Sequence, residues 1–429
     1  MMTYKETTEY LFNSAPLFQH IGKEAYKEGL ANTWTLDEHF GHPHRNFRCI
    51  HIAGTNGKGS CSHTLAAILQ RAGYKVGLYT SPHLVDFRER IRVNGEMIPE
   101  QRVIDFVARE RAFFEPLHPS FFELTTALAF LYFAECQVDV AVIEVGLGGR
   151  LDCTNIIRPD LSIITNISFD HTQFLGNTLA LIAGEKAGII KQDTPVVIGE
   201  TTEETRKVFI DKAKEMNALL QFAEEDHEVI SSVPSGLGGR IYQTRSWEQL
   251  EGELGGLYQE KNTNTVLCAV KMLRNLGYTI EDNHLREGFA RVCELTGLRG
   301  RWQIIGKSPL ILCDTGHNMG GIRYIAEQLS ALPARTLRIV IGMVNDKDVR
   351  GALAALPAQA TYYFTKANVK RALPEQELQE IARELGRTGT SYASVKEAYT
   401  QACSEASSED VVFVGGSSFI VADLLSTCF

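Results

Sequence analysis

The stretch FRCIHIAGTNGKGS, residues 47–60, decides the fold of this chain. Its apolar run at 50–53 predicts a short buried strand, and a glycine-rich turn follows before a helical pattern begins. The glycines let backbone N–H groups turn toward an anion, and Lys58 adds a positive charge at the mouth of the helix. A glycine-rich turn alone often has only a steric purpose, but the lysine favours a phosphate-binding loop in which Ser60 can bind Mg²⁺. An ordinary Walker A loop has Ser or Thr directly after the lysine, whereas Gly59 intervenes in this chain.

The composition is that of a globular protein of 429 residues, 44% of them hydrophobic, which is long enough for two domains. No run of about 18 apolar residues occurs, and the N-terminal MMTYKETTEYLF has neither a basic nor an apolar signal region. We therefore expect no membrane span, no signal peptide and a cytoplasmic location. The nine cysteines are scattered and never spaced CxxC, which favours reduced thiols, mostly in the core, over disulfides or structural zinc. A net charge of −9 argues against nucleic-acid binding, so an anionic substrate needs local cations.

Runs of β-branched residues alternate with helical patterns from residue 47 onward. The predicted strands lie at 75–81, 138–146, 161–167 and 194–199, with amphipathic segments between several of them. This alternation predicts an α/β fold with a doubly wound, mostly parallel sheet. Ligands of such sheets bind beyond the carboxyl ends of the strands, and the chemically rich residues of this chain fall at those ends.

A second, smaller α/β unit is predicted after Gly297. A helical stretch from about 260 to 296 precedes this glycine, and the alternation of strand and helix restarts beyond it. Helices of this unit, which is Rossmann-like but has no GxGxxG loop, are expected near 319–331, 374–386 and 394–407. Loops around a short β excursion are expected at 231–240 and 251–256. We therefore divide the chain into a P-loop ATP-binding domain, 1–297, and a C-terminal ligase domain, 298–429.

Three strand ends bring metal-binding side chains to one edge of the predicted sheet. Glu144 ends an apolar strand at the position where nucleotide-hydrolysing enzymes place an acid to hold Mg²⁺. A solvated cap is the alternative, but the glycine turn that follows, with Arg150 and Asp152, favours a functional role. His171 closes the next strand and Ser81 closes a third, so that an imidazole and a hydroxyl reach the same edge.

Other polar residues have both a structural and a functional interpretation. Lys186 in GEKAGII lies on a helical pattern where a surface lysine is usual, and its ammonium form cannot bind a metal. Asn262, Arg301 and the DTGHN segment at 314–318 are either routine turn and cap residues, with Asn318 as a helix N-cap, or groups that line a cleft. Their expected position, facing the first domain, favours the cleft.

With these motifs assembled, the chain resembles the folylpolyglutamate synthase/dihydrofolate synthase family of the Mur ligase superfamily, which are ATP-dependent amide-forming ligases. The resemblance covers nearly the whole chain and is densest in GHPHRNFRCIHIAGTNGKGS, YTSPHL, ERIRVNG, FFELTTALAF, VIEVGLGGRLDCTN, FDHTQFLG, GEKAGII, GRWQ, DTGHN and IGMVNDKD. The GKGS ending is similar to the folate branch, whereas cell-wall Mur ligases usually have Thr directly after the lysine. One departure is Gly316, where Ala commonly precedes the histidine, and we expect it to matter little.

The resemblance implies a role for each motif. The phosphate loop comprises Gly54, Thr55, Asn56, Gly57, Lys58, Gly59 and Ser60. Magnesium, with two ions expected, is held by Ser60, Ser81, Glu144 and His171. ATP is also held by Asn262, Arg301, Asp314 and His317. The expected catalytic residues are Lys58, Arg301, His317 and Lys186, the last of which matches the family's carbamylated lysine. The segments near the pterin-bearing substrate include Phe122, Glu123, Arg150 and Asp152.

The implied reaction is phosphorylation of a carboxylate by ATP, followed by attack of the amine of L-glutamate, which gives an amide, ADP and phosphate. The enzyme must bring two anions together, and two unit charges about 4 Å apart repel by about 4 kcal/mol at an effective dielectric near 20. A divalent metal with Lys58 and Arg301 offsets this repulsion. We expect domain closure over ATP to exclude water from the acyl phosphate.

Two other functions stay open from the residues alone. A Mur-type peptide ligase shares the ATPase core, but residues 1–46 look helical and are too few for a separate UDP-sugar domain. A nucleotide-hydrolysing switch protein needs no second substrate pocket, and the second domain argues against it. The motifs do not distinguish dihydropteroate from reduced folates as acceptor, and they leave Lys186 carbamylation and a monovalent cation open. We expect only small-molecule substrates, ATP and L-glutamate among them, and a monomer.

Overall fold

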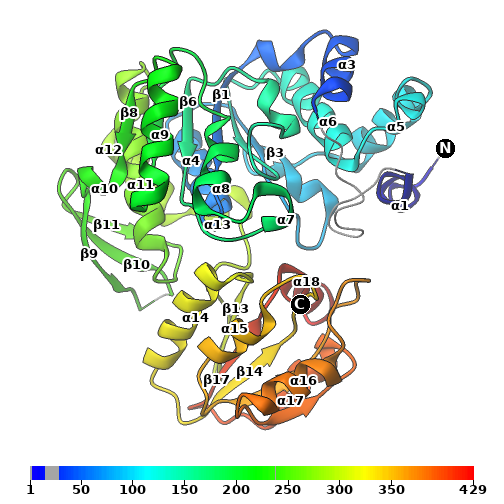
Figure 1. Cartoon of the computed structure of the whole chain (residues 1–429), viewed down its shortest axis with the longest axis vertical. Coiled ribbons are helices and arrows are strands. Elements are labelled where there is room, and N and C mark those ends of the chain that lie inside the picture. The colour runs from blue at the N-terminus through cyan, green and yellow to red at the C-terminus, as the bar shows by residue number, and fades with distance from the viewer. Residues whose placement is uncertain (1, 15–28, 237) are drawn as a thin grey trace. The chain divides into compact units, whose positions relative to one another are not determined.

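The computed structural model describes residues 2–14, 29–236 and 238–429, which divide into two compact units (Figure 1). The first unit contains Met1–Ser232, Tyr242–Gly252 and Glu260–Gly297, and the second contains Val233–Ile241, Glu253–Gln259 and Leu298–Phe429. Two short segments before residue 297 thus pack with the second unit, whereas the sequence predicts one division at 297. The assignment of 1–297 and 298–429 to separate functional domains stays a prediction.

The first unit is built on an eight-stranded sheet with the order β4-β3-β2-β5-β1-β6-β7-β8. Neighbours from β2 to β8 are parallel, and β3 pairs antiparallel with both β2 and β4. The strands are β1 (Arg48–Ala53), β2 (Val76–Tyr79), β3 (Ile91–Val93), β4 (Glu96–Met97), β5 (Val140–Glu144), β6 (Leu161–Ile164), β7 (Val196–Ile198) and β8 (Leu220–Phe222). The predicted α/β class with a mostly parallel sheet is confirmed.

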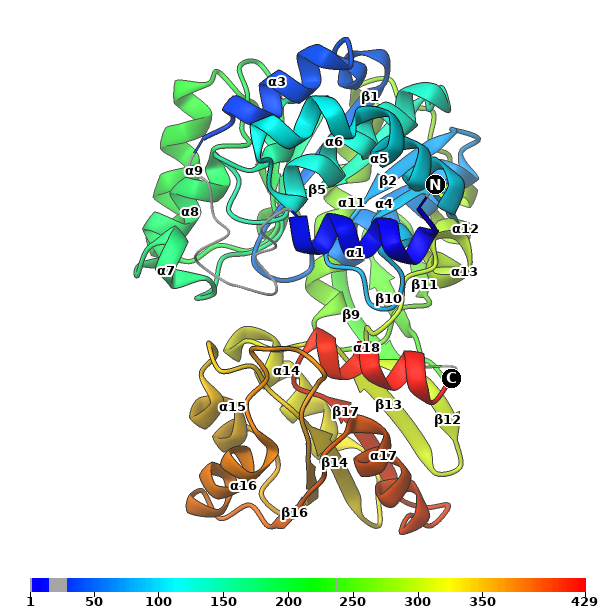
Figure 2. The ribbon, with the colours of Figure 1, turned by 90° about the vertical axis from the view of Figure 1, so that its right-hand side faces the viewer.

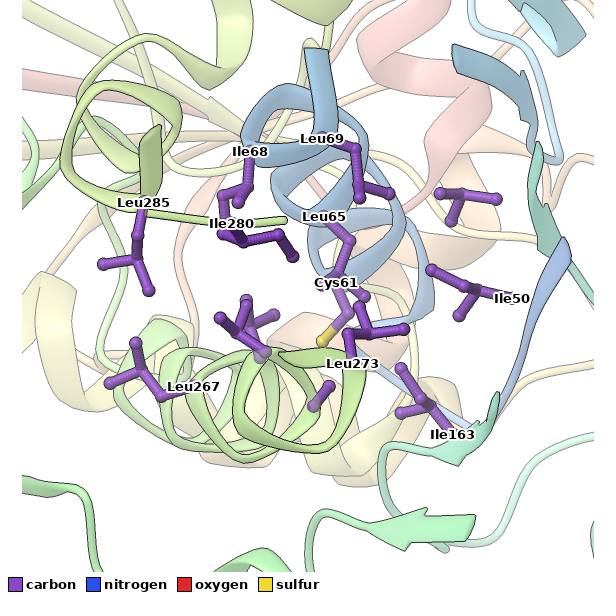
Figure 3. Packing of buried hydrophobic residues seen from close by; sticks show 14 of the residues in the cluster. Ile50, Cys61, Leu65, Ile68, Leu69, Ile163, Leu267, Leu273, Ile280 and Leu285 are labelled. Carbon is purple, nitrogen blue, oxygen red and sulfur yellow. The ribbon is translucent and has the colours of Figure 1, made fainter. Parts of the chain in front are cut away.

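Helices cover both faces of this sheet because alternate strand residues point to opposite sides. Ile50 and Ile52 pack with α4, α11 and α12 on one face, as the close view in Figure 3 shows for Ile50. On the other face, α3, α5 and α6 cover β2 and β5 (Figure 2), and α8 and α9 cover β6 and β7 (Figure 1). The longer helices are α1 (Tyr4–Ser14), α3 (Ala31–His39), α4 (Lys58–Arg71), α5 (Glu100–Phe114), α6 (Phe121–Glu135), α8 (Leu179–Ala187), α9 (Glu203–Glu215), α11 (Gln259–Asn275) and α12 (Asp282–Ala290).

The expected helical stretch over 260–296 is divided into α11, α12 and α13 (Val292–Thr296). Gly277, with φ +85°, follows α11 and supplies the left-handed conformation that ends helices. Gly297, with φ +70°, ends α13 in the same way. The N-terminal region is helical at α1 and α3, while the part of that prediction that falls on residues 15–28 lies outside the described residues.

A three-stranded sheet, in the order β11-β10-β9, forms the β excursion after α10 (Ala223–Asp226). Its strands are β9 (Val229–Pro234), β10 (Arg240–Thr244) and β11 (Gln249–Gly252). The loop predicted at 231–240 is therefore wrong over its first residues, which continue β9. Two apolar residues of this strand, Ile230 and Val233, are exposed.

The second unit is a six-stranded sheet with the order β12-β13-β17-β14-β15-β16. Only β12 is antiparallel to its neighbour among these pairs. The strands are β12 (Gln303–Lys307), β13 (Leu310–Asp314), β14 (Leu337–Ile341), β15 (Thr361–Phe364), β16 (Gly389–Ser391) and β17 (Val411–Gly415), and the helices are α14 (Met319–Ala331), α15 (Val349–Ala355), α16 (Glu375–Glu384), α17 (Val395–Ser404) and α18 (Ser418–Thr427). The three predicted helices correspond to α14, α16 and α17.

No cysteine is disulfide-bonded, and four of the nine are buried, namely Cys49, Cys61, Cys268 and Cys313. The expectation that most of them lie in the core is therefore wrong, because the other five are only partly buried. Across the described part of the chain, no helix has the length and apolar character needed to cross a membrane.

Candidate active site

The phosphate loop follows β1 and is braced by the residues after β6. Gly54 has φ +145°, and a Cβ there would lie less than 3.0 Å from Thr165 Oγ1. The Thr165 hydroxyl donates to Asn56 O at 2.5 Å, and the Thr55 amide donates to Asn166 O at 2.9 Å. Glycine at position 54 therefore lets two neighbouring strand ends close on the loop.

Asn262 of α11 lies against another glycine of the loop. Gly57 is the N-cap of α4 with φ +84°, and a Cβ there would lie less than 3.0 Å from Asn262 Oδ1. Asn262 is only 7% exposed. The first turn of α4 contains Lys58, Gly59 and the buried Ser60. Its backbone N–H groups face the loop, which is the usual arrangement of an anion site at a helix N-terminus.

Two lysine ammonium groups share one backbone carbonyl of this loop. Lys58 Nζ lies 3.0 Å from Gly54 O, and Lys186 Nζ from α8 lies 2.9 Å from the same oxygen. Lys186 is 4% exposed. Burial, together with the nearby charge of Lys58, lowers the pKa of Lys186 to about 7. A substantial fraction of Lys186 is therefore the neutral amine at neutral pH.

Glu144 and Ser81 meet at the carboxyl edge of the first sheet. Because β5 lies between β2 and β1 and is parallel to both, its last residue, Glu144, lies beside the residues that follow those strands. The Ser81 amide donates to Glu144 Oε2 at 3.3 Å, and Glu144 is 3% exposed. A buried carboxylate next to a serine supplies the hard oxygen atoms that magnesium prefers.

His171 follows β6 at the same edge. It has φ +49° and precedes α7 (Thr172–Leu175), and its Nε2 lies 3.8 Å from Asp170 Oδ1. This segment is tied to the phosphate loop because the Ser168 amide donates to Thr55 Oγ1 at 3.0 Å. Among the described residues, no three His, Cys, Asp or Glu side chains form a metal-binding group. The predicted ligand set therefore depends on serine hydroxyls.

The glycine turn after β5 packs closely against the C-terminal end of α8 and holds it in place. A Cβ on Gly149 would lie 2.8 Å from Glu185 O and 3.0 Å from Lys186 O, so only glycine permits this approach. The Arg150 guanidinium pairs with Glu185 at 2.9 Å, and the Arg150 amide donates to Glu185 O at 2.8 Å. Asn155 Nδ2 donates to Arg150 O at 3.0 Å. The turn thus fixes the helix end that carries Lys186.

Both carboxylates among the four residues predicted near the pterin substrate are occupied by local hydrogen bonds. Glu123 forms a capping box at the start of α6, where its carboxylate accepts the Ser120 amide at 2.6 Å. Asp152 is buried and accepts the Leu147 amide at 2.9 Å and the Thr154 hydroxyl at 2.5 Å. Burial raises the pKa of Asp152, while these donors favour its ionised form. Both side chains therefore shape the local backbone.

Phe122 has a different environment from the other three. Its ring centroid lies 5.8 Å from that of Tyr79, and a Cβ on Gly146 would lie less than 3.0 Å from the ring. The ring therefore packs directly on the backbone of the glycine turn. Phe122 is partly exposed, as an aromatic side chain that stacks on a flat substrate needs to be.

In the second unit, Asp314 ends β13 and organises the DTGHN segment. It is 2% exposed and accepts the Tyr258 hydroxyl at 2.6 Å. It also accepts the Trp302 and Gly316 amides, each at 2.7 Å. Burial raises the pKa of this carboxyl, and the three donors and Arg301 oppose that shift.

Arg301 and His317 both contact Thr315. The Arg301 guanidinium donates to the Thr315 hydroxyl, and His317 Nδ1 lies 3.0 Å from Thr315 O. Since a carbonyl only accepts, His317 Nδ1 carries a proton. Asn318 is the N-cap of α14 and accepts the Gly321 amide at 3.0 Å, which confirms its predicted capping role. The second unit thus gathers three of the four predicted ATP contacts beyond the loop, and Asn262 belongs to the first.

Sequence reasoning missed several residues that build this site. Thr165 and Asn166 brace the phosphate loop, and the TN pair directly after an apolar strand is a signal that could have identified them. Tyr258, which donates to Asp314, lies in a short irregular segment with no pattern that indicates this role. These contacts join residues far apart in the chain, and local patterns carry little information on such pairs.

Two family models match the chain. The Mur ligase middle domain matches residues 52–270, and the Mur ligase glutamate ligase domain matches residues 300–418. The dihydrofolate synthase/folylpolyglutamate synthase of Escherichia coli is 37% identical over 87% of this chain and 85% of its own length. The folylpolyglutamate synthase of Lacticaseibacillus casei is 34% identical over 87% of this chain and 88% of its own.

Solved structures resemble the chain over its whole length. E. coli FolC in complex with DHPP and ADP has a TM-score of 0.84 and 32% identity, covering 100% of this chain and 98% of that one. The bifunctional folylpolyglutamate synthase/dihydrofolate synthase of Yersinia pestis, complexed with AMPPNP and a Mn ion, has a TM-score of 0.82 and 30% identity, with the same coverage.

Proposed function

Because this chain belongs to the Mur ligase family and, within it, to the dihydrofolate synthase/folylpolyglutamate synthase branch, we propose that it adds L-glutamate to a pterin-bearing carboxylate. The chain is an ATP-dependent, amide-forming ligase of glutamate. Dihydropteroate and the glutamyl tail of reduced folates are the two acceptor classes. Phosphorylation of the acceptor carboxylate gives an acyl phosphate, which the glutamate amine attacks with release of phosphate.

The observation that carries this proposal is the phosphate loop and its two lysines. Lys58 and Lys186 converge on Gly54 O, at the same sheet edge as the buried Glu144. Cations at the N-terminus of α4 suit the transfer of a phosphoryl group, since charge on the phosphate oxygens must be neutralised as the bond to ADP breaks. Lys58 is the residue that we assign to the transferred phosphate.

Ser60, Ser81, Glu144 and His171 would hold magnesium. Their hydroxyl, carboxylate and imidazole donors fit a divalent cation, and the buried Glu144 beside Ser81 supports this set. Bound magnesium supplies positive charge to the nucleotide phosphates. Two magnesium ions are our proposed number, and a monovalent-cation requirement is a point for assay.

Lys186 is proposed to react with CO₂. Its neutral amine attacks the carbon of CO₂ and loses one proton, which leaves an anionic carbamate. The lowered pKa supports this step, because only the neutral amine is nucleophilic. The carbamate oxygen atoms would then face the loop from the end of α8. Carbon-13 NMR of native protein in ¹³C-bicarbonate would show a carbamate signal that Lys186→Arg lacks.

The remaining ATP contacts are proposed to be Asn262, Arg301, Asp314 and His317. Of these, Arg301 and His317 are also proposed to act on the transferred phosphoryl group. His317→Ala should then lower kcat far more than it lowers thermal stability, because its side chain is partly exposed and its Nδ1 bonds a backbone carbonyl, Thr315 O, at 3.0 Å. Equal losses of turnover and stability would count against a catalytic role.

The pterin subsite is proposed at the glycine turn, with Phe122 as the stacking residue and Asp152 as the group that holds the turn. Glu123 and Arg150 are less suited to contact the pterin, because the capping box occupies the first side chain and the ion pair with Glu185 occupies the second. Small-molecule substrates, a cytoplasmic location and a monomeric state complete the proposal. Residues 1–297 and 298–429 are proposed as the ATP-binding domain and the ligase domain.

The test is glutamate-dependent ADP release by the purified protein with ATP and Mg²⁺, comparing dihydropteroate with tetrahydrofolate and identifying the products by mass. Turnover with both acceptors establishes a bifunctional enzyme, and turnover with one assigns the pathway step. ADP release that is indifferent to glutamate and to both pterins would refute the ligase and favour a nucleotide-hydrolysing switch. Turnover only with a nucleotide-linked peptide would favour a Mur-type peptide ligase.

A further inference from the structure

We propose that His51 is a positioning residue that fixes the glycine turn after β5 through Thr154 and Asp152, and so shapes the pterin subsite in which the acceptor binds. The proposal rests on the proposed function, because it takes this turn to be part of the pterin subsite. None of the motif assignments above uses His51. It lies in the middle of β1, within the stretch that leads into the phosphate loop.

The contacts form a chain of three side chains. His51 is fully buried, and its Nε2 lies 2.8 Å from Thr154 Oγ1. Thr154 Oγ1 lies 2.5 Å from Asp152 Oδ1. Thr154 and Asp152 are also buried, in and before the short helix η5 (Cys153–Ile156). A central strand of the sheet is thereby connected to the loop that follows its neighbour β5.

The direction of each hydrogen bond follows from counting protons. The Asp152 carboxylate already accepts two backbone amides, from Thr154 at 3.0 Å and from Leu147 at 2.9 Å, so it acts as the acceptor of the Thr154 hydroxyl proton. Having given its only proton to Asp152, Thr154 Oγ1 accepts from His51. His51 is therefore the tautomer with the proton on Nε2.

The other ring nitrogen agrees with this assignment. His51 Nδ1 is buried and has no hydrogen-bond partner among the residues that the structure describes. A bare lone pair there is tolerated more easily than a buried N–H group or a charged ring without a partner. Burial, with the nearby charge of Lys191, lowers the pKa of His51 to about 3, so the ring is neutral at physiological pH.

The last of these hydrogen-bonded side chains, Asp152, lies at the proposed pterin subsite. Asp152 Oδ2 holds the Leu147 amide, and the adjacent Gly146 packs its backbone on the ring of Phe122. Without the His51 donor, the Thr154 hydroxyl can turn away from Asp152, and the turn loses one of its fixed points. The phosphate loop is braced separately by Thr165 and Asn166, so its geometry does not depend on the hydrogen bonds from His51 to Asp152.

Steady-state kinetics of two variants test the inference. His51→Leu should raise KM for the pterin acceptor about tenfold, the usual effect of one hydrogen bond to a charged network, and leave KM for ATP within about twofold. His51→Gln should recover most of the loss, because its side-chain amide nitrogen can replace Nε2 as donor to Thr154. Equal rises of both KM values, or a glutamine variant as impaired as the leucine variant, would overturn the inference.

Imidazole ¹⁵N NMR of the wild-type protein provides a readout that needs neither activity nor a folded variant with leucine. The His51 signal, identified by its absence from His51→Gln, should show a protonated Nε2 and an unprotonated Nδ1. The opposite tautomer would overturn the hydrogen-bond chain. The Nε2–H tautomer with an unchanged acceptor KM in His51→Leu would refute the link to the acceptor. If wild-type protein turned over no pterin acceptor, the proposed function would fail. The tautomer of His51 would still show whether the hydrogen bonds from His51 through Thr154 to Asp152 exist.

Discussion

Gly57→Ala should weaken both the folding of the first unit and the binding of ATP, and Gly73→Ala is its matched control. The two glycines have nearly the same backbone angle, with φ +84° at Gly57 and +87° at Gly73. A Cβ on Gly57 would lie less than 3.0 Å from Asn262 Oδ1, whereas a Cβ on Gly73 would meet no atom of the described part of the chain within 4 Å. The comparison therefore separates backbone strain from collision with Asn262.

The magnitudes follow from these two terms. A positive φ costs alanine about 1–2 kcal/mol at either position. At Gly57 the buried Asn262 amide must also move, and leaving such a group unsatisfied adds about 1–3 kcal/mol. Gly57→Ala should thus lower the free energy of unfolding by about 2–5 kcal/mol and Gly73→Ala by about 1–2 kcal/mol. Because Gly57 caps α4, KM for ATP should rise at least about tenfold in the first variant alone.

Urea unfolding followed by circular dichroism measures the stabilities, and steady-state assays measure KM for ATP. The double variant Gly57→Ala/Asn262→Ala removes the collision, so its loss of stability should be smaller than the sum of the two single losses. Equal losses in the Gly57 and Gly73 variants, or simple additivity with Asn262→Ala, would refute the packing of Asn262 on the phosphate loop.

Three further changes test single residues. Lys186→Met should abolish turnover yet raise the free energy of unfolding near pH 6. Folding lowers the pKa of Lys186 from 10.5 to about 7, so the unfolded chain binds more protons between these pH values and the stability of the wild-type protein rises with pH there. The stability advantage of the methionine variant should therefore shrink as the pH rises. Urea titrations at pH 6 and 9 check this, and a pH-independent difference would contradict it. Glu123→Ala should lower the free energy of unfolding by about 1 kcal/mol, as loss of a cap does, with acceptor KM within about twofold; a much larger rise in KM would indicate pterin contact. Gly316→Ala should change the unfolding free energy by no more than about 1 kcal/mol and leave KM for ATP unchanged, since its Cβ would lie 2.6 Å from the flexible end of Ile325, which can shift at little cost, and 3.1 Å from Asp314 Oδ1, which need move only a few tenths of an ångström. Thermal melts and steady-state assays measure the two effects, and a large loss of ATP affinity would contradict this expectation.

The first sheet was predictable from sequence because its strands are short apolar runs between glycine turns. Such runs belong in the middle of parallel sheets, and β1, β5, β6 and β7 fall within or next to the predicted ranges. Strand β16 was missed because its sequence, Gly389–Ser391, has no hydrophobic pattern and it forms by pairing with β15. The excursion of 253–259 into the second unit also has no local signal, since packing alone decides it.

The candidate site was predictable where one residue type serves one chemistry. Lys58 after a glycine turn and Glu144 at a strand end indicate phosphate and metal without knowledge of their neighbours. Glu123 and Asp152 show the opposite case, because a carboxylate near a helix start looks the same whether it binds a substrate or caps a backbone. Only the Ser120 amide on Glu123 and the Leu147 amide on Asp152 reveal the structural roles.

The pairing of Lys58 and Lys186 on Gly54 O gives a physical reason for the proposed carbamylation of Lys186. Two cations on one carbonyl repel each other, and the burial of Lys186 makes it the one that gives up its proton. In the carbamylation that we propose, loss of that proton makes Lys186 a nucleophile for CO₂, and the carbamate would attract Lys58 instead of repelling it. The proposed conversion of Lys186 to an anion would leave Lys58 to pair with the phosphate. A single lysine at this carbonyl would lack the repulsion that favours loss of the proton. The glycine turn holds the end of α8 that carries Lys186, and it therefore keeps the second lysine at this carbonyl.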